Sequence, residues 1–316
     1  MASIRGKLFM LMTRMQNINP FTHPDAIRKM QKLSKWYIND KMPKGYSLEK
    51  KTTLNGTAYQ IIRKNGLTAP VKTIYYIHGG CYVCGLVSNY HTFLTDCCEM
   101  TGGTQIVLLD YKLAPEYQYP KQLDEAYDLW SELTEKQNIR PENIVIGGDS
   151  SGGNLALALM LRLRDEDRKL PAGAFLLSPW TDMTVSGDSY EYNYGNDVEI
   201  GEKRGVFTEE KRQMLLESDL FCFVGSADRT DPYVSPVFGE FYGFPPVFFS
   251  VGEHEMLLDD SLRIVEKMKK TGIPVICERK PEMFHTYVLY KNYMPESRES
   301  FARMKEFIQE CMSDHR

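Results

Sequence analysis

Apolar residues along the chain follow two alternating patterns. Short runs rich in β-branched residues, typical of buried strands, alternate with longer segments in which apolar residues recur every three or four positions, as on one face of a helix. We expect strands at 73–77, 104–109, 143–147, 174–178, 246–251 and 274–279, and helices near 88–100, 121–137, 153–168, 259–271 and 296–313. The alternation predicts an α/β fold with a mostly parallel, doubly wound central sheet and helices on both faces.

Three segments depart from this alternation. Residues 46–65 alternate apolar and polar positions on both sides of Asn55-Gly56, which predicts an antiparallel hairpin. Residues 1–45 are Met-rich and helical in pattern, and residues 183–230 begin rich in Gly, Asp and Tyr and then become helical. We expect 1–45 and 183–230 to form a helical cap, with the second segment inserted into a main domain of residues 46–316.

The junction between the strand and the helix in residues 143–156 contains the motif G-x-S-x-G, centred on Ser150. In this context the serine lies on a sharp turn, the glycines leave room for a substrate, and the helix dipole favours negative charge. Ser150 is therefore the expected nucleophile of a hydrolase. For the motif alone, a glycine-rich turn that only packs a strand on a helix is the alternative.

Two further segments carry candidate chemistry. His78 to Cys81 follow the strand at 73–77, and glycines there can point N–H groups at a carbonyl oxygen as it becomes tetrahedral. We interpret His78, at the end of that strand, as a residue that orients the loop. Among six histidines, His285 is the best candidate for a general base, because it lies in a loop after the strand at 274–279.

The acid partner of the histidine is expected between Ser150 and His285 in the chain. Glu255 lies just beyond the strand at 246–251, where parallel sheets collect their functional groups. Asp259 and Glu253 are the alternatives, although Asp259 has the position of a first-turn residue in the next helix. We predict Glu255 as the group that orients the histidine and stabilises the imidazolium.

Taken together, these motifs resemble the hormone-sensitive-lipase-like family of α/β-hydrolases over residues 70–310. The resemblance rests on His78-Gly79-Gly80 and on residues 111–116, 148–153 and 178–182. It implies the α/β-hydrolase fold, serine carboxylesterase or lipase activity and a cap over the active site. By position it implies that Ser150 is the nucleophile, Glu255 the acid and His285 the base. It also implies an oxyanion hole with three N–H donors and one supporting glycine: Gly80, Cys81 and Ser151, with Gly79 in support.

Three positions depart from the family pattern. Cys81 replaces the third glycine of H-G-G-G, and it can still supply a main-chain N–H where its backbone angles are tolerated. Ser151 stands where alanine is common, and it keeps the N–H. Glu255 replaces the usual aspartate, an accepted variant whose extra methylene requires compensation in the backbone.

Composition narrows the range of partners. The net charge of −4 with no basic stripe argues against nucleic acid or an anionic membrane as the main partner. The apolar run at 8–12 is too short for a signal peptide or a membrane span, and no long exposed amphipathic segment is apparent, so we expect a cytoplasmic protein with no stable membrane insertion. Seven cysteines fit reduced thiols, and Cys81 and Cys84 form a single C-x-x-C without a second pair. We expect no metal and no cofactor.

The prediction is a serine carboxylesterase that hydrolyses short-to-medium acyl esters through an acyl-enzyme. Amidase, deacylase and lactone hydrolase activities are the first alternatives, because the same triad serves them all. A non-catalytic receptor for a small ligand is a remote alternative, and homodimerisation is a family-level expectation. Glu116 and Asp182 are read as solvated turn carboxylates, with tethering of the loop or cap as the alternative. Aromatic residues of the insertion form either a pocket lining or the core of the cap: Tyr190, Tyr192, Tyr194, Phe207, Phe221 and Phe223.

Overall fold

The computed structural model describes residues 2–16, 29, 31, 32, 34, 40–67, 72–99, 103–202 and 205–313. Within these residues the predicted N-terminal helical segment contains helix α1, Ile4–Gln16. Most of what the pattern indicates for residues 17–39 lies outside the described part of the chain.

The described residues contain one sheet of eight strands in the order β1-β2-β4-β3-β5-β6-β7-β8. The strands are β1 Tyr46–Thr52, β2 Ala58–Lys64, β3 Lys72–Ile77, β4 Thr104–Asp110, β5 Ile144–Asp149, β6 Gly173–Leu177, β7 Val247–Gly252 and β8 Val275–Lys280. β1 pairs with β2 and β2 with β4 in antiparallel fashion, and all other neighbours are parallel. The predicted mostly parallel sheet and the hairpin around Asn55-Gly56 are confirmed.

The longer helices also follow the predicted order, with different ends. They are α3 Asn89–Thr95, α4 Lys121–Ser131, α5 Ser151–Asp165, α8 Leu258–Lys270 and α9 Pro295–Cys311. Helix α3 is shorter than predicted, and α4 continues as a single π-helical turn over Glu132–Lys136. Helix α5 begins directly after Ser150, earlier than the apolar periodicity indicates, because Gly152 and Gly153 carry no apolar side chain for the pattern to register.

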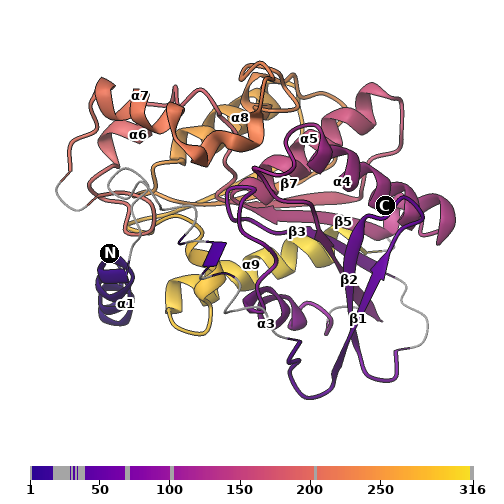
Figure 1. Ribbon diagram of the computed structural model, residues 1–316. Helices are drawn as coiled ribbons and strands as arrows, with labels where there is room; N and C mark the ends of the chain where they lie inside the picture. Colours follow the sequence, from indigo (N-terminus) through magenta and orange to yellow (C-terminus); the bar gives the residue numbers. More distant parts are fainter. Residues whose placement is uncertain are drawn as a thin grey trace.

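The sheet is covered on both faces, as Figure 1 shows. Helices α4, α5 and α8 lie on one face, and α3 and α9 lie on the other. Successive side chains of β3 point to opposite faces of the sheet. The buried ring of Tyr75 packs in the core on the side of α4, α5 and α8, and that of Tyr76 packs in the core on the side of α3 and α9. Burial of both faces explains why the central strands are apolar at every position.

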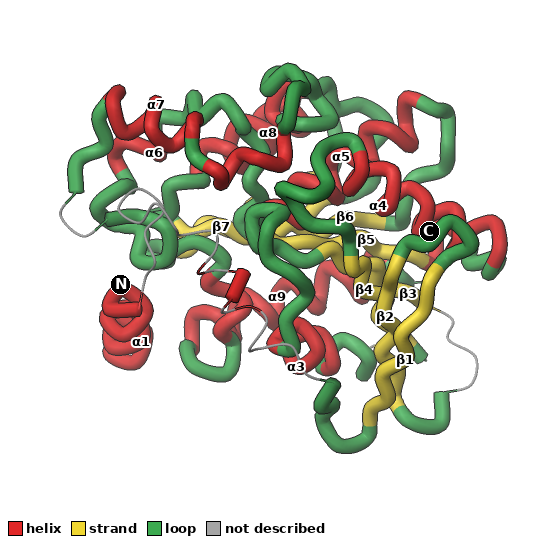
Figure 2. The backbone as a smooth tube through the Cα atoms, viewed as in Figure 1, coloured by secondary structure: helices red, strands yellow, loops and turns green. Residues whose placement is uncertain are grey.

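The segment between β6 and β7 is mostly loop with short helices, as Figure 2 shows. It contains α6 Ser189–Tyr192, α7 Glu209–Glu217 and a 3₁₀ helix, η3 Asp219–Val224. Asp182 at its start is buried, contrary to the reading of a solvated carboxylate, and it accepts hydrogen bonds from Ser186 and Arg263. It therefore ties the insertion to α8, whereas Glu116 is exposed.

The first turn of α5 touches the end of β3 backbone to backbone. A Cβ added at Gly152 would overlap the carbonyl oxygens of Ile77 and His78, and neither oxygen belongs to a flexible side chain that could move away. We predict that Gly152→Ala lowers the free energy of unfolding by about 1–3 kcal/mol, measured by urea denaturation. Gly85→Ala is the matched control, because its Cβ would meet only Leu113, at 3.7 Å. Equal effects of the two substitutions would contradict this assignment.

Candidate functional site

The predicted site residues follow the carboxyl ends of parallel strands in the same sheet. Ser150 comes directly after β5, Glu255 lies three residues beyond β7, and His285 lies five residues beyond β8. The loop that contains Gly79 follows β3, next to β5 in the sheet. Because the carboxyl ends of parallel strands share one edge, this order of strands gathers the residues at that edge.

Ser150 has a backbone conformation that L-residues rarely adopt, with φ +50° and ψ −122°. Three backbone hydrogen bonds hold it there. Its N–H donates to Leu177 O, and its carbonyl accepts from the N–H groups of Asn154 and Trp180. The turn thus fixes a buried serine at the N-terminus of α5, where the helix dipole favours negative charge.

Glu255 and His285 form a buried pair. Nδ1 of His285 lies 3.3 Å from Oε2 of Glu255, and the N–H of Gly252 donates to Oε1 at 2.9 Å. The hydroxyl of Ser178 donates to Glu255 and accepts the N–H of Thr286, at 3.0 Å. Ser178, the residue directly after β6, therefore links the carboxyl group of Glu255 to the backbone of Thr286, next to His285.

The alternatives to Glu255 point elsewhere. Asp259 accepts hydrogen bonds from the N–H of Ser189 and the hydroxyl of Tyr192, as expected for a residue of the first turn of α8. Glu253 lies in an exposed ion pair with Arg279. Glu255 is the one of these three carboxyl groups that contacts His285.

Burial opposes charge on both members of this pair. It raises the pKa of Glu255 to about 8, although the hydrogen bonds from Ser178 and Gly252 work in the opposite direction. Burial also lowers the pKa of His285, and three acidic groups oppose that shift: Asp197, Glu199 and Asp149. Each partner therefore depends on the other, or on these carboxylates, for a favourable charged state.

Two of these acidic residues come from the insertion, and the sequence analysis missed both. Asp197 accepts the N–H of Met256, at 3.0 Å, next to Glu255. Glu199 accepts the hydroxyl of Tyr290 with both carboxylate oxygens, and burial raises its pKa to about 7. No motif marked them, since they follow an irregular segment and approach His285 only in the folded chain.

The glycine loop is tied to the nucleophile turn through Asp149. Its Oδ1 accepts the N–H of Gly79 at 3.0 Å and the hydroxyl of Tyr76 at 2.8 Å, and its Oδ2 accepts the hydroxyl of Tyr90 at 2.9 Å. A Cβ at Gly79 would overlap the Asp149 carboxylate. The Gly79 N–H is thus already engaged, so Gly79 can support the loop but cannot at the same time donate to an oxyanion.

The other predicted donors remain available. Among the described residues, the N–H groups of Gly80 and Cys81 have no hydrogen-bond partner. Ser151 is the first residue of α5, where N–H groups lack a partner within the helix. Cys81 has φ +56°, so the loop does impose the strained backbone that a glycine would adopt more easily.

His78 is buried and stacks on Tyr111, with ring centroids 4.3 Å apart. Its Nδ1 lies 2.7 Å from the carbonyl of Gly79, and burial lowers its pKa to about 4. A neutral, stacked imidazole that holds a loop carbonyl fits a residue that orients the loop.

The matches to known proteins agree with this arrangement. A family model described as alpha/beta hydrolase fold matches residues 74–289. The chain belongs to the α/β-hydrolase fold family. An esterase of Acinetobacter venetianus is 34% identical over 236 residues, 75% of this chain and 74% of the relative. An acetyl-hydrolase of Streptomyces hygroscopicus is 30% identical and covers 75% of each chain.

Solved structures resemble this α/β-hydrolase over almost its whole length. The crystal structure of EstE5 soaked with p-nitrophenyl butyrate has a TM-score of 0.85 and 28% identity, and the match covers 98% of this chain and 99% of that one. An esterase of the bacterial hormone-sensitive lipase family has a TM-score of 0.83, 25% identity and coverage of 99% and 100%. The predicted resemblance to that family is confirmed.

The cysteines next to the glycine loop are free thiols. Burial raises the pKa of Cys81 to about 12 and that of Cys84 to about 11. Both thiols are therefore protonated and weakly nucleophilic near neutral pH.

Most of the predicted aromatic residues of the insertion are buried in the core of this α/β-hydrolase: Tyr190, Tyr194, Phe207, Phe221 and Phe223. Phe223 stacks on Tyr82 with centroids 3.7 Å apart, and Phe221 meets Trp180 edge to face at 4.9 Å. Since Tyr82 follows the glycine loop and Trp180 bonds to Ser150, the insertion packs on both sides of the nucleophile turn.

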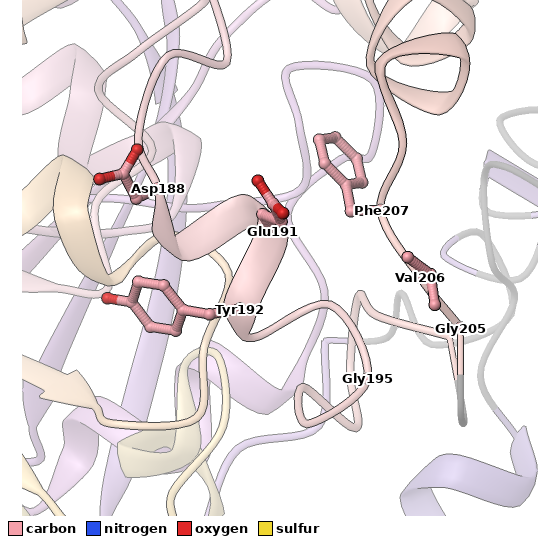
Figure 3. Close-up of a pocket in the computed structure, with 7 residues that line it drawn as sticks. All are labelled: Asp188, Glu191, Tyr192, Gly195, Gly205, Val206 and Phe207. Carbon is pink, nitrogen blue, oxygen red and sulfur yellow. The ribbon is translucent and has the colours of Figure 1, made fainter.

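A surface pocket of about 410 Å³ lies within the insertion, as Figure 3 shows. Its lining includes Asp188, Glu191, Tyr192 and Phe207, but neither Ser150 nor His285. It is therefore separate from the candidate site.

In the part of the chain that the structure describes, none of the helices combines the length and apolar character needed to cross a bilayer.

We predict that the imidazoles of His78 and His285 remain neutral below the usual pKa of histidine. Burial should bring the midpoint of His78 to about 4 and that of His285 below 6.5. Side-chain ¹⁵N NMR over a pH titration measures both, with His78→Asn and His285→Asn to assign the signals. A midpoint at or above 6.5 for His285 would show that the acidic groups outweigh burial.

Proposed function

We propose that this protein is a serine carboxylesterase that hydrolyses short-to-medium acyl esters through a triad of Ser150, His285 and Glu255. The observation that carries the proposal is the buried contact between Glu255 and His285, at the same edge of the sheet as the strained Ser150 turn. Relatives named esterase, acetyl-hydrolase and acetyl esterase support a carboxylic ester hydrolase. A small ester is the corresponding substrate.

The reaction begins with proton transfer from the Ser150 hydroxyl to His285 as the serine oxygen attacks the ester carbonyl. The C–O bond to the alcohol then breaks, and the alcohol leaves with the proton from His285. Water, deprotonated by the same histidine, attacks the acyl-enzyme and releases the carboxylic acid, which restores the Ser150 hydroxyl. Glu255 holds Nδ1 of the imidazole, so that Nε2 is the nitrogen that exchanges protons.

Charge develops at two places during this reaction, and the site has groups for each. The N–H groups of Gly80, Cys81 and Ser151 serve as donors to the oxyanion, and the N-terminus of α5 adds its dipole. The imidazolium is favoured by three acidic groups, Asp197, Glu199 and Asp149, and the carboxyl group of Glu255 lies against Nδ1 of His285. Each donor contributes about 3–4 kcal/mol to the stability of the transition state.

We also propose that residues 1–45 and 183–230 form a cap on the catalytic domain of residues 46–316. Arg14 of α1 donates to the carbonyl of Asn196, so the two segments touch. Asn193 donates to the carbonyl oxygens of both Glu253 and Glu255, which joins the insertion to the loop after β7. Phe221 and Phe223 pack beside the nucleophile turn, and we expect them to restrict the acyl site to short rather than long chains.

Hydrolysis of a p-nitrophenyl ester series from acetate to palmitate tests the substrate class. We expect the highest kcat/KM on short chains, a steep decline toward palmitate, and a loss of about 10⁴-fold or more in Ser150→Ala. Ser47→Ala, an exposed serine on β1, is the control and should keep full activity. Cleavage of matched p-nitroanilides but not of the esters would favour an amidase, and no cleavage of either would favour a receptor.

Covalent labelling tests the nucleophile independently of turnover. An alkyl p-nitrophenyl phosphonate should lose p-nitrophenol and leave one phosphonyl group on Ser150, since the phosphorus mimics the tetrahedral carbon. Mass spectrometry of the intact chain and its peptides measures the adduct. We expect none in Ser150→Ala and much slower labelling in His285→Asn. An adduct on another residue in the wild-type chain would remove Ser150 from the mechanism.

A further inference from the structure

Helix α1 has an apolar face that is exposed. Five of its side chains are between 52% and 90% exposed: Ile4, Leu8, Leu11, Met12 and Met15. Their spacing of four, three, one and three residues places them within an arc of about 100° on a helix with 3.6 residues per turn. They therefore form one continuous stripe rather than scattered exposed residues, and a stripe of this kind marks an interaction surface.

The opposite face of α1 packs on the rest of the protein. The ring of Phe9 lies 4.9 Å from that of Tyr290 and 5.4 Å from that of Tyr293. At the start of the helix, the N–H groups of Ala2 and Ser3 donate to carboxylates of the C-terminal part of the chain. Both sides of the helix therefore carry apolar residues. Because one side is held against the protein by these contacts, the stripe on the other side faces outward.

The charges on α1 indicate what the stripe contacts. Arg5 and Lys7 are exposed and flank the stripe on opposite sides, and Arg14 lies near its end. None of the described residues of α1 is acidic. The chain-wide net charge of −4, which argued against an anionic surface, therefore hides a local excess of positive charge on this helix.

We propose that α1 docks the protein on an anionic lipid surface, with the stripe in the region between headgroups and acyl chains and the basic residues on the headgroups. An apolar helix face flanked by Lys and Arg is the arrangement by which peripheral proteins bind such surfaces. A second copy of this chain fits less well, because pairing two stripes face to face would bring their flanking cations together.

Docking at this helix places the lipid surface beside the candidate site. Phe9 also stacks on Phe284, which precedes His285, and Tyr290 is the residue that bonds to Glu199. The sequence alone does not reveal this exposed face, because the side of α1 that packs on the protein also carries apolar residues.

Vesicle co-sedimentation of the full chain tests the proposal without any measurement of catalysis, so its outcome is separate from that of the esterase assignment. We expect binding to vesicles of phosphatidylcholine mixed with phosphatidylserine, and weak binding to phosphatidylcholine alone. The double substitution Leu8→Ser and Leu11→Ser should lower partitioning roughly tenfold, and Arg5→Gln with Lys7→Gln should lower it and weaken its dependence on salt.

The control is Leu54→Ser, which removes a leucine at the tip of the β1–β2 hairpin that is 89% exposed, more than either leucine of the stripe variant. It should bind vesicles like the wild-type protein. Circular dichroism and thermal unfolding of each variant exclude loss of the fold. Absence of vesicle binding, or equal binding by the stripe variant and the control, would overturn the proposal. A dimer of the wild-type protein that dissociates in the stripe variant, measured by sedimentation velocity, would also overturn it, since the stripe would then be a contact between two copies of the chain.

Discussion

Backbone contact between the end of β3 and the first turn of α5 is the constraint on which the candidate site depends. Gly152 permits it, since any side chain there would overlap the carbonyl oxygens of Ile77 and His78. Asp149 completes the contact by holding the glycine loop and two tyrosine hydroxyls with one carboxylate. The loop and the Ser150 turn therefore form one rigid unit, and the strain at Ser150 is sustained by its surroundings.

The second constraint is electrostatic. Glu255 and His285 are both buried, so neither favours charge alone, and the contact between them makes their protonation states interdependent. Asp197 and Glu199 extend this network into the insertion. The insertion therefore contributes charge as well as cover, and a change in its position would alter the basicity of His285.

Helix α1 connects this network to the surface. Its inner face packs on residues next to His285, and its outer face is the exposed stripe between basic side chains. Arg14 also donates to the carbonyl of Asn196, so α1 contacts both the C-terminal part of the chain and the insertion between β6 and β7. A helix with one apolar face on the protein and another facing outward is stable only if the first contact suffices to hold it, and the bonds of Ala2 and Ser3 add to that contact.

The amino-acid sequence by itself determined the strands and the order of the helices, and it marked Ser150, His285 and Glu255 as the candidate triad. These depend on local signals: runs of apolar residues, glycines at a sharp turn, and polar residues just beyond strand ends. Only the tertiary structure decided what depends on distant contacts. It showed that the N–H of Gly79 is occupied by Asp149, that Ser178 joins Glu255 to Thr286, and that the outer face of α1 is exposed. Sequence periodicity tells which residues share a face, but the partner of that face is set by segments far away in the chain.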